Sequence, residues 1–348
     1  MKNLPLGIQD FRELREKNLL YIDKTEIIHN LLISKYYFLS RPRRFGKSLL
    51  ISTLHELFSG NKELFSGLWI ENKIEWKSYP VIRIDFSAID YKGNGFWSAI
   101  QKHLRNIAES YQIHLESESP KDLLGELIRN LHTKYQAQVV LLIDEYDKPI
   151  IDFLEDLDKA REHRDFLKNL YSIIKPMDSY LKFVFLTGVS KFSKVSIFSD
   201  LNNLTDISTH PRYINILGYT QSELEHYFAD RIEQLTASQE IQKEELLEKI
   251  KTFYNGYSWN GKDFLYNPFS VLSYFDAEQF SNFWFSTGTP TFLTKLLQKD
   301  FVYNLSKVKS NQLALDSVNL ENPNLTALLF QTGYLTIKEQ LPHRMFRL

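Results

Sequence analysis

A lysine and a serine at the start of a helical pattern are the first residues whose spacing suits phosphate chemistry. They close the segment Arg41–Ser48 (RPRRFGKS), which lies between a short apolar run and the helical pattern. This is the context of a P-loop, in which backbone N–H groups at a helix start bind phosphate. We expect Lys47 to contact the β- and γ-phosphates of a nucleotide and Ser48 to place its hydroxyl on Mg²⁺.

The segment departs from the common P-loop pattern at its first position. That pattern, G-x-x-x-x-G-K-[ST], starts with glycine, whereas this sequence has Arg41. Arginine lacks the backbone freedom of glycine, so an ordinary basic turn that caps a helix is the alternative interpretation. The candidate nucleotide-binding residues are Arg41, Pro42, Arg43, Arg44, Phe45, Gly46, Lys47, Ser48 and Leu49.

Two carboxylates follow a second apolar run. Residues 139–143 (VVLLI) are typical of a central parallel strand covered on both faces, and Asp144 and Glu145 come directly after them. Downstream of a Gly-Lys-Ser loop, the pair predicts that Asp144 holds Mg²⁺ and that Glu145 polarises the attacking water. The alternative is that both acids only end the strand and cap the next helix. For Asp147, a helix cap and a catalytic role are both open.

A polar residue also follows a third apolar run, at 183–186. In ATPases with an extra strand beside the P-loop strand, a residue at this place contacts the γ-phosphate or the attacking water. Thr187 is the first candidate for this role and Ser190 is the second. A turn opened by Gly188 is the alternative interpretation.

The elements that must position these residues alternate along the chain. Apolar runs predict strands at 36–39, 81–86, 139–143 and 183–186. Helical spacing occurs at 27–32, where Asp23 or Thr25 can cap the helix, and at 50–58. It also occurs at 120–131, with Ser119 as N-cap and Pro120 in the first turn, and at 166–174, which Pro176 closes. This alternation predicts an α/β unit with a parallel sheet. After Gly218 the pattern is mainly helical, with helix starts at Thr220, Asn267-Pro268 and Thr289-Pro290.

Composition restricts the class of protein. The chain has 348 residues, a net charge of −1, no cysteine and nine histidines without ligand spacing. The near-neutral charge gives no general argument for nucleic-acid binding, and the lack of cysteine excludes a thiolate zinc site and a cysteine nucleophile. No histidine metal site is expected. Because the sequence contains neither a signal-peptide core nor an apolar run of about 18 residues, we expect a cytoplasmic protein without a membrane partner.

Taken in order, these motifs resemble the bacterial AAA-ATPase-like family. The resemblance spans nearly the whole chain, through segments 21–25, 41–49, 144–149, 187–194, 197–204, 218–220, 254–257, 266–270 and 329–335. An arginine in place of the first loop glycine is the form that this family uses. The resemblance implies a P-loop NTPase of the AAA+/STAND-like, ASCE class, with segment 41–48 as Walker A and Asp144-Glu145 as Walker B. It also implies ATP and Mg²⁺ as cofactors.

The resemblance further implies how the chain is divided. We predict an ATPase domain at 1–217, a helical lid at 218–300 that hinges near Leu217-Gly218, and a helical or winged-helix segment at 301–348. Similar proteins continue into a C-terminal nuclease-like domain, and this sequence ends about where that domain would begin. It has no D/E-x-K pair in nuclease spacing, Asp90-Tyr91-Lys92 being the nearest fragment, so no nuclease activity is assigned.

The expected function is Mg²⁺-dependent ATP binding and hydrolysis that drives a conformational switch. Glu145, Lys47 and Thr187 are the catalytic candidates, and Ser48 and Asp144 are the Mg²⁺ ligands. Two alternatives stay open: a nucleotide-gated module with little turnover that regulates an attached nuclease-like domain, and a module that handles nucleic acid through that absent domain. A homo-oligomer also stays open.

Overall fold

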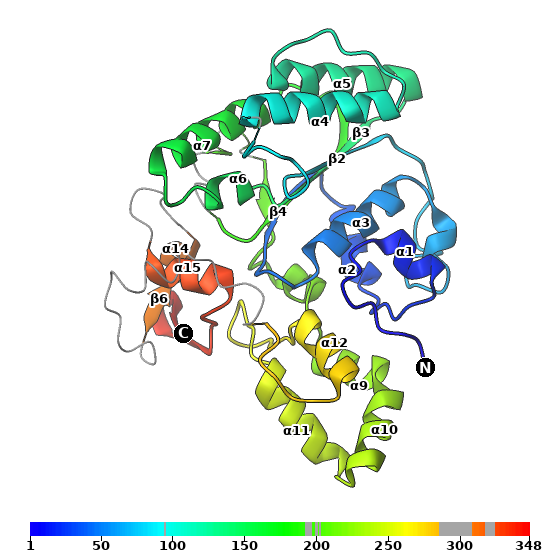
Figure 1. The fold of residues 1–348 in the computed structure, drawn as a ribbon, viewed down its shortest axis with the longest axis vertical. Coiled ribbons are helices and arrows are strands. Elements are labelled where there is room, and N and C mark those ends of the chain that lie inside the picture. Colours follow the sequence, from blue (N-terminus) through cyan, green and yellow to red (C-terminus); the bar gives the residue numbers. More distant parts are fainter. Residues whose placement is uncertain (94, 192–196, 199–200, 202, 285–307, 317–323) are drawn as a thin grey trace.

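The computed structural model describes residues 1–93, 95–191, 197–198, 201, 203–284, 308–316 and 324–348. Its largest feature is a five-stranded sheet in which every pairing is parallel (Figure 1). In spatial order the strands are β2 (Val81–Asp85), β3 (Val139–Asp144), β4 (Leu181–Gly188), β1 (Tyr36–Ser40) and β5 (Thr205–Asp206). The predicted α/β fold is confirmed, and β4 is the expected extra strand beside β1.

Helices cover both faces of this sheet. They are α1 (Phe11–Glu16), α2 (Thr25–Leu31), α3 (Lys47–Phe58), α4 (Phe96–Ser110), α5 (Pro120–Tyr135), α6 (Lys148–Ile151) and α7 (Leu157–Tyr171). Leu141 and Ile143 of β3 pack in the core with α4, α5 and α7, whereas Val140 and Leu142 pack in the core with α1, α2 and α3 (Figure 1). A strand covered on both faces needs apolar residues at every position, which explains the continuous run of β3.

Three predicted helix starts are confirmed in detail. Ser119 caps α5 by accepting a hydrogen bond from the Asp122 backbone N–H, with Pro120 in the first turn. Thr220 and Glu223 form a capping box at α9 (Gln221–Tyr227). Asn267 caps α12 (Pro268–Ala277). The predicted start at Thr289-Pro290 lies outside the described residues.

Several helices differ from the sequence prediction, and α4 was not predicted. The N-terminal region holds two short helices instead of one, and α2 has Lys24 at its N-cap without a side-chain cap. Asp23 instead accepts hydrogen bonds from the backbone N–H and hydroxyl of Thr25. Helix α7 begins well before the predicted 166 and already ends at Tyr171, before Pro176. Its first half is rich in charged residues, so its apolar stripe is weak there.

Two further units follow the sheet. The first contains α9, α10 (Ala229–Gln239), α11 (Lys243–Tyr254) and α12, and it lies below the sheet in Figure 1. The second contains β6 (Lys309–Asn311), α14 (Gln312–Asp316), α15 (Leu325–Thr332), β7 (Glu339–Leu341) and β8 (Met345–Arg347). Its three strands form an antiparallel sheet in the order β6-β8-β7. The domain boundaries and the winged-helix assignment stay predictions, and the boundary at 300/301 lies outside the described residues.

Short 3₁₀ segments complete the described secondary structure. They are η1 (Lys62–Phe65), η2 (Asp178–Tyr180), η3 (Pro211–Ile216) and η5 (Pro342–Arg344). Of these, η3 joins the sheet to the helical unit and contributes to the site described below. None of the helices in the described part of the chain has both the length and the apolar character that crossing a bilayer requires.

Candidate nucleotide-binding site

The candidate residues meet at the carboxyl edge of the sheet, where parallel strands all end. Ser40 at the end of β1 is paired in register with Gly188 at the end of β4. On the other side of β4, Asp85 of β2 is paired with Asp144 of β3. In open α/β sheets this edge is where ligands bind, because loops from several strands converge there.

The loop 41–46 joins β1 to α3 through two left-handed residues. Arg44 has φ 68° and Gly46, the N-cap of α3, has φ 93°. Glycine adopts this conformation without a steric penalty, which explains why the position before Lys47 is glycine. The start of α3 therefore faces the carboxyl edge of the sheet, and a helix start favours bound anions.

Lys47 lies across this loop and is almost fully buried. Its Nζ donates hydrogen bonds to the carbonyl oxygens of Arg41 at 3.2 Å and Pro42 at 3.3 Å. The same nitrogen lies 3.5 Å from the Glu145 Oε1. The structure thus brings the predicted loop lysine and the predicted water-activating acid into direct contact.

Asp144 is fully buried beside Ser48. One carboxylate oxygen accepts the Glu145 backbone N–H at 3.0 Å. Burial raises the Asp144 pKa to about 6, although the nearby Ser48 side chain acts in the opposite direction. Oδ2 of Asp144 has no hydrogen-bond partner in the described part of the chain. A buried carboxylate oxygen of this kind fits a Mg²⁺ ion or a water molecule bound to it.

Thr187 lies one strand away, at the end of β4. Its side chain is buried, and its Oγ1 lacks a hydrogen-bond partner among the described residues. Its register partner on β1 is Leu39, so it lies between the loop strand and the strand that carries Asp144. The hydroxyl is a suitable donor to a phosphate oxygen or a water at this edge.

Comparison with known proteins shows the family of this chain. The sequence profile described as "Predicted AAA-ATPase" matches residues 5–198, more than half of the chain. The chain belongs to the AAA-ATPase-like family. A relative, the uncharacterized protein in the vnfD 5′ region of Azotobacter chroococcum mcd 1, is 42% identical over 348 residues. That match covers 97% of this chain but only 64% of the relative, so the chain spans less than two thirds of that protein's length.

Arg41, which replaces the usual first glycine in this AAA-ATPase-like loop, turns its side chain away from the helix start. Its φ is not in the left-handed region, so the loop tolerates a residue other than glycine here. The buried guanidinium donates to carbonyl oxygens and stacks on Trp259 at 3.9 Å, and burial lowers its pKa to about 9. The carbonyl oxygens belong to Ser40, Ser208, Tyr213 and Ile214. Only the backbone of Arg41 is thus placed to contribute to the loop.

The remaining loop residues face other parts of the molecule. Arg43 and Arg44 are exposed, and the Arg44 guanidinium lies 4.2 Å from the ring centre of Phe269 at the start of α12. Phe45 is buried against Tyr257 and Trp259, with ring centres 4.7 and 5.4 Å away. Leu49, in the first turn of α3, packs against the core between the sheet and helices α1, α2 and α3. The loop therefore contacts the helical unit through its apex, a link that spacing in the sequence does not reveal.

The cap interpretation of Asp147 is wrong for its side chain. Asp147 stands at the N-cap of α6, but its side chain makes no cap hydrogen bond. The buried carboxylate instead accepts the backbone N–H groups of Val189 and Ser190 and the Ser190 hydroxyl. Burial, followed by the charge of Glu145, raises the Asp147 pKa to about 6. Asp147 is thus joined by buried hydrogen bonds to Ser190, which lies three residues after Thr187 in the chain.

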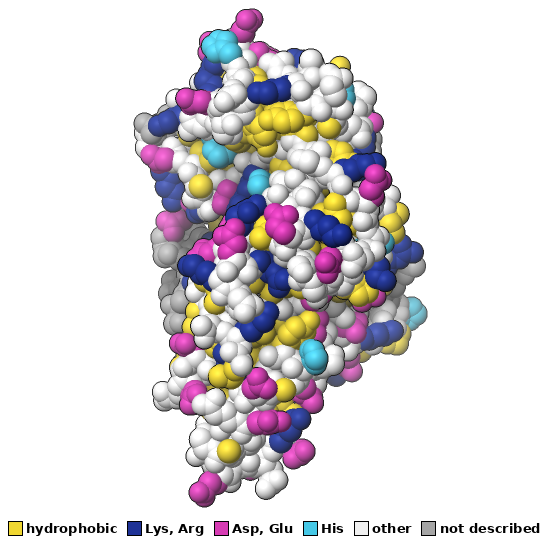
Figure 2. Space-filling view, turned by 90° about the vertical axis from the view of Figure 1, so that its right-hand side faces the viewer, with side chains coloured by type: hydrophobic (Ala, Val, Ile, Leu, Met, Phe, Trp, Pro, Cys, Tyr) yellow, Lys and Arg dark blue, Asp and Glu magenta, His cyan; other side chains and the backbone are white. Residues whose placement is uncertain are grey.

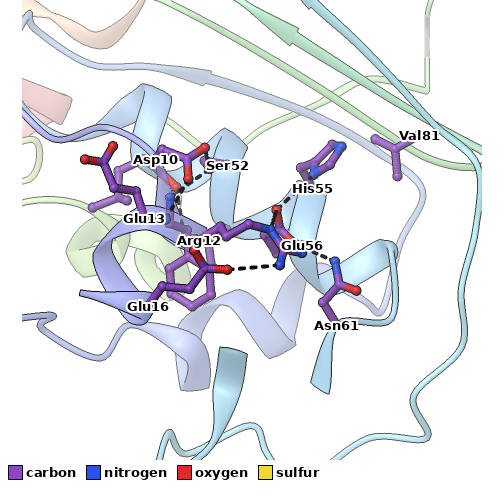
Figure 3. Close-up of polar contacts among 12 residues, drawn as sticks. Asp10, Arg12, Glu13, Glu16, Ser52, His55, Glu56, Asn61 and Val81 are labelled. Carbon is purple, nitrogen blue, oxygen red and sulfur yellow. Dashed lines mark hydrogen bonds and ion pairs between the residues drawn. The ribbon is translucent and has the colours of Figure 1, made fainter. Parts of the chain in front are cut away.

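A polar network that sequence reasoning missed holds α3 in place (Figure 3). Arg12 of α1 donates to both oxygens of Glu56 on α3, at 3.3 and 2.8 Å, and Asn61 donates to the same carboxylate. Ser52 of α3 accepts the Phe11 backbone N–H at 2.9 Å. The bonds from Arg12 and Phe11 join positions more than 40 residues apart, so no local pattern could indicate them.

Proposed function

We propose that this protein binds ATP with Mg²⁺ at the carboxyl edge of its sheet and hydrolyses it. One observation carries the proposal. Lys47 lies 3.5 Å from Glu145 and Ser48 lies next to Asp144, so the proposed phosphate-binding cation, Mg²⁺ ligands and base converge at the start of α3. Membership of the AAA-ATPase-like family supports nucleotide binding at such a site.

Each residue has a distinct role in this proposal. The backbone N–H groups of the loop and Lys47 bind the phosphates, and Lys47 exchanges its bonds to carbonyl oxygens for bonds to phosphate oxygens. Ser48 and Asp144 hold Mg²⁺, which when bound neutralises charge on the β- and γ-phosphates. Glu145 orients and deprotonates the attacking water. Thr187 donates from β4 to the γ-phosphate or to that water.

The experiment is a paired measurement of ATP affinity by calorimetry and of steady-state turnover. Lys47→Ala should weaken ATP binding by roughly tenfold or more, since it removes charge-assisted bonds to the phosphates. Glu145→Gln should keep the affinity and lower turnover by roughly a hundredfold or more. Lys182→Ala is the matched control, because Lys182 is an exposed lysine near the opposite end of the same sheet. Unchanged affinity in Lys47→Ala would contradict the site.

The nucleotide-gated module with little turnover uses the same residues. It is favoured if wild-type protein binds Mg–ATP tightly but hydrolyses it no faster than Glu145→Gln. The nucleic-acid module has less support, because basic and acidic side chains are interspersed over the face shown in Figure 2. DNA binding that weakens steeply with added salt would favour it.

A further inference from the structure

The turn after β3 and the turn after β4 are joined by buried hydrogen bonds. The Tyr146 backbone N–H donates to the Thr187 carbonyl at 3.0 Å, and its hydroxyl donates to the Ser190 carbonyl at 2.9 Å. Asp147 accepts three more bonds from the β4 turn: the Val189 N–H at 3.2 Å, and the N–H and hydroxyl of Ser190, both at 2.6 Å. We name this set of five bonds the two-turn clasp.

Gly188 leaves the space that the clasp needs. A Cβ built on Gly188 would lie 2.4 Å from Asp147 Oδ1 and 2.7 Å from the Tyr146 ring. Real Cβ atoms do not come this close, so any side chain at 188 would displace the carboxylate. The close fit indicates that the turn after β3, which carries Asp147, packs directly against the turn after β4.

The clasp requires an acid at position 147. Asp147 accepts all three bonds through its two oxygens and is fully buried. An asparagine has only one oxygen acceptor, so its NH₂ group would face either the Val189 or the Ser190 donors. Burying a carboxylate costs free energy unless it is hydrogen-bonded, and here all of its hydrogen bonds come from the turn after β4.

The clasp lies directly between two of the proposed functional residues. Glu145 immediately precedes Tyr146 and has a left-handed φ of 53°, and Thr187 immediately precedes Gly188. Moving one turn relative to the other would change the separation between the proposed base and the proposed phosphate or water ligand. A misplacement of about 1 Å can slow a reaction by roughly a hundredfold.

We propose that Asp147 is a positioning residue that fixes the Glu145 turn against Thr187 for ATP hydrolysis. This proposal rests on the proposed function. Asp147 itself contacts neither the nucleotide phosphates nor the attacking water in this scheme. Its loss should therefore lower turnover while leaving ATP affinity nearly intact, which separates it from Lys47 and Ser48.

The test compares Asp147→Asn with Asp152→Asn, the same change at the C-cap of the same short helix. Asp152 binds Lys148, Lys92 and Tyr91, and among the described residues it makes no bond to the β4 turn. Asp147→Asn should keep ATP affinity within roughly threefold and lower turnover by roughly tenfold or more. A tenfold change in rate corresponds to about the free energy of one lost charge-assisted hydrogen bond. Asp152→Asn should leave both within roughly twofold. Normal turnover in Asp147→Asn would overturn the proposal.

A second variant and a second measurement keep the test decisive. If Asp147→Asn does not fold, Ser190→Ala removes one bond of the clasp and should still lower turnover more than Asp152→Asn does. If the wild-type protein binds ATP without turnover, the proposed hydrolysis fails and amide exchange decides. Asp147→Asn or Ser190→Ala should then speed exchange at Val189 and Ser190 with Mg–ATP bound, and Asp152→Asn should not. Unchanged exchange would overturn the clasp.

Discussion

Buried polar atoms at the carboxyl edge of the sheet differ in their hydrogen bonding. Asp147 is buried with bonds to both carboxylate oxygens, as expected for a structural carboxylate. Asp144 Oδ2 and Thr187 Oγ1 are buried without a hydrogen-bond partner among the described residues. A buried polar atom without a partner costs about 1–3 kcal/mol, and at the carboxyl edge of the sheet a bound group could supply the partner. The position of these two atoms at the edge matters here, since other buried atoms of the described residues, such as the Tyr171 hydroxyl, also have no partner.

Thr187 offers a prediction in which stability and activity change in opposite directions. Thr187→Val replaces the unpartnered hydroxyl with a methyl group of similar volume, so thermal stability should stay constant or rise by about 1 kcal/mol. Turnover should fall roughly tenfold or more because a donor to the reacting phosphate or water is lost. Thr187→Ser, which keeps the hydroxyl, should retain most of the turnover. Equal turnover in both variants would contradict a role for this hydroxyl.

The site residues could be located from the sequence because each one lies at the end of an apolar run or at a helix start. Lys47, Asp144 and Thr187 all lie where the periodic pattern predicts that a strand ends or a helix starts. Their roles stay predictions. The partners of Arg41 and Asp147 could not be predicted, since Trp259 and Ser190 are far away in the sequence and have no periodic signature.

At the scale of elements, α1 fixes the helix that carries the loop lysine. Figure 3 shows Arg12 and Asn61 directed at Glu56, whose side chain is only 6% exposed. On its outer side Arg12 also lies 3.4 Å from Glu16, which is 58% exposed. The same arginine thus has a buried and an exposed acidic partner, which provides a matched pair of variants.

We expect Glu56→Ala to lower the free energy of unfolding by about 1–3 kcal/mol, because it leaves the partly buried donors of Arg12 and Asn61 without their acceptor. Glu16→Ala should lower it by less than about 0.5 kcal/mol, as for other exposed ion pairs. Urea unfolding of both variants measures the difference. Equal effects would show that the α1–α3 network does not hold the helix.

The same carboxylate predicts a pH dependence with a defined sign. Burial alone would raise the Glu56 pKa, but hydrogen bonds from His55, Asn61 and Arg12 outweigh it and lower the pKa from 4.5 to about 2. The ionised form is therefore favoured in the folded protein, and its stabilisation is complete above pH 4.5 and is lost as the pH falls toward 2. The stability difference between wild type and Glu56→Gln should shrink between pH 6 and pH 3.5. A difference that grows on acidification would contradict this network.

Most elements with a clear pattern were predicted, but not all of them. Apolar runs predicted four of the five strands of the sheet, and β5, with two residues, is too short to show a pattern. Helices α5 and α9 were predicted from their caps, whereas α4 was missed although it has 15 residues. Helix α1 has only six residues, too few for a helical period to be visible. The cap expected at Asp23 became a turn bond to Thr25 because the chain reaches α2 one residue later.

At the scale of the whole molecule, the loop is in contact with all other units. Arg41 stacks on Trp259, and Pro42 lies next to Gly333 at the end of α15, where an added Cβ would approach it to 2.9 Å. Lys24, just before α2, forms an ion pair with Glu223 of α9 at 2.6 Å. Residues near the N-terminus therefore also pack with the helical unit. A division of the chain into consecutive domains does not describe this contact.

These contacts restrain rotation at the expected hinge near Leu217-Gly218. Gly218 has φ 84°, and a Cβ there would approach Leu265 to 3.1 Å and the Phe45 ring to 3.2 Å. Rotation of the helical unit about this glycine would therefore move Trp259 relative to Arg41, the residue that opens the loop. If Lys47 releases the Arg41 carbonyl oxygen when ATP binds, as proposed, we expect the environment of the Trp259 indole to change with it.

Trp259 should consequently report nucleotide binding through its fluorescence. Mg–ATP should change the tryptophan emission of the wild-type protein, and Trp259→Phe should remove most of that change while keeping ATP affinity within roughly tenfold, since the phenyl ring still packs on the guanidinium. Trp97→Phe is the control, because Trp97 is 47% exposed on α4, on the far side of the sheet from α3. If the ATP-dependent change persists in Trp259→Phe and is lost in Trp97→Phe, nucleotide binding is not transmitted through the Arg41–Trp259 contact. The loop would then act independently of the helical unit, and the conformational switch would require a different connection.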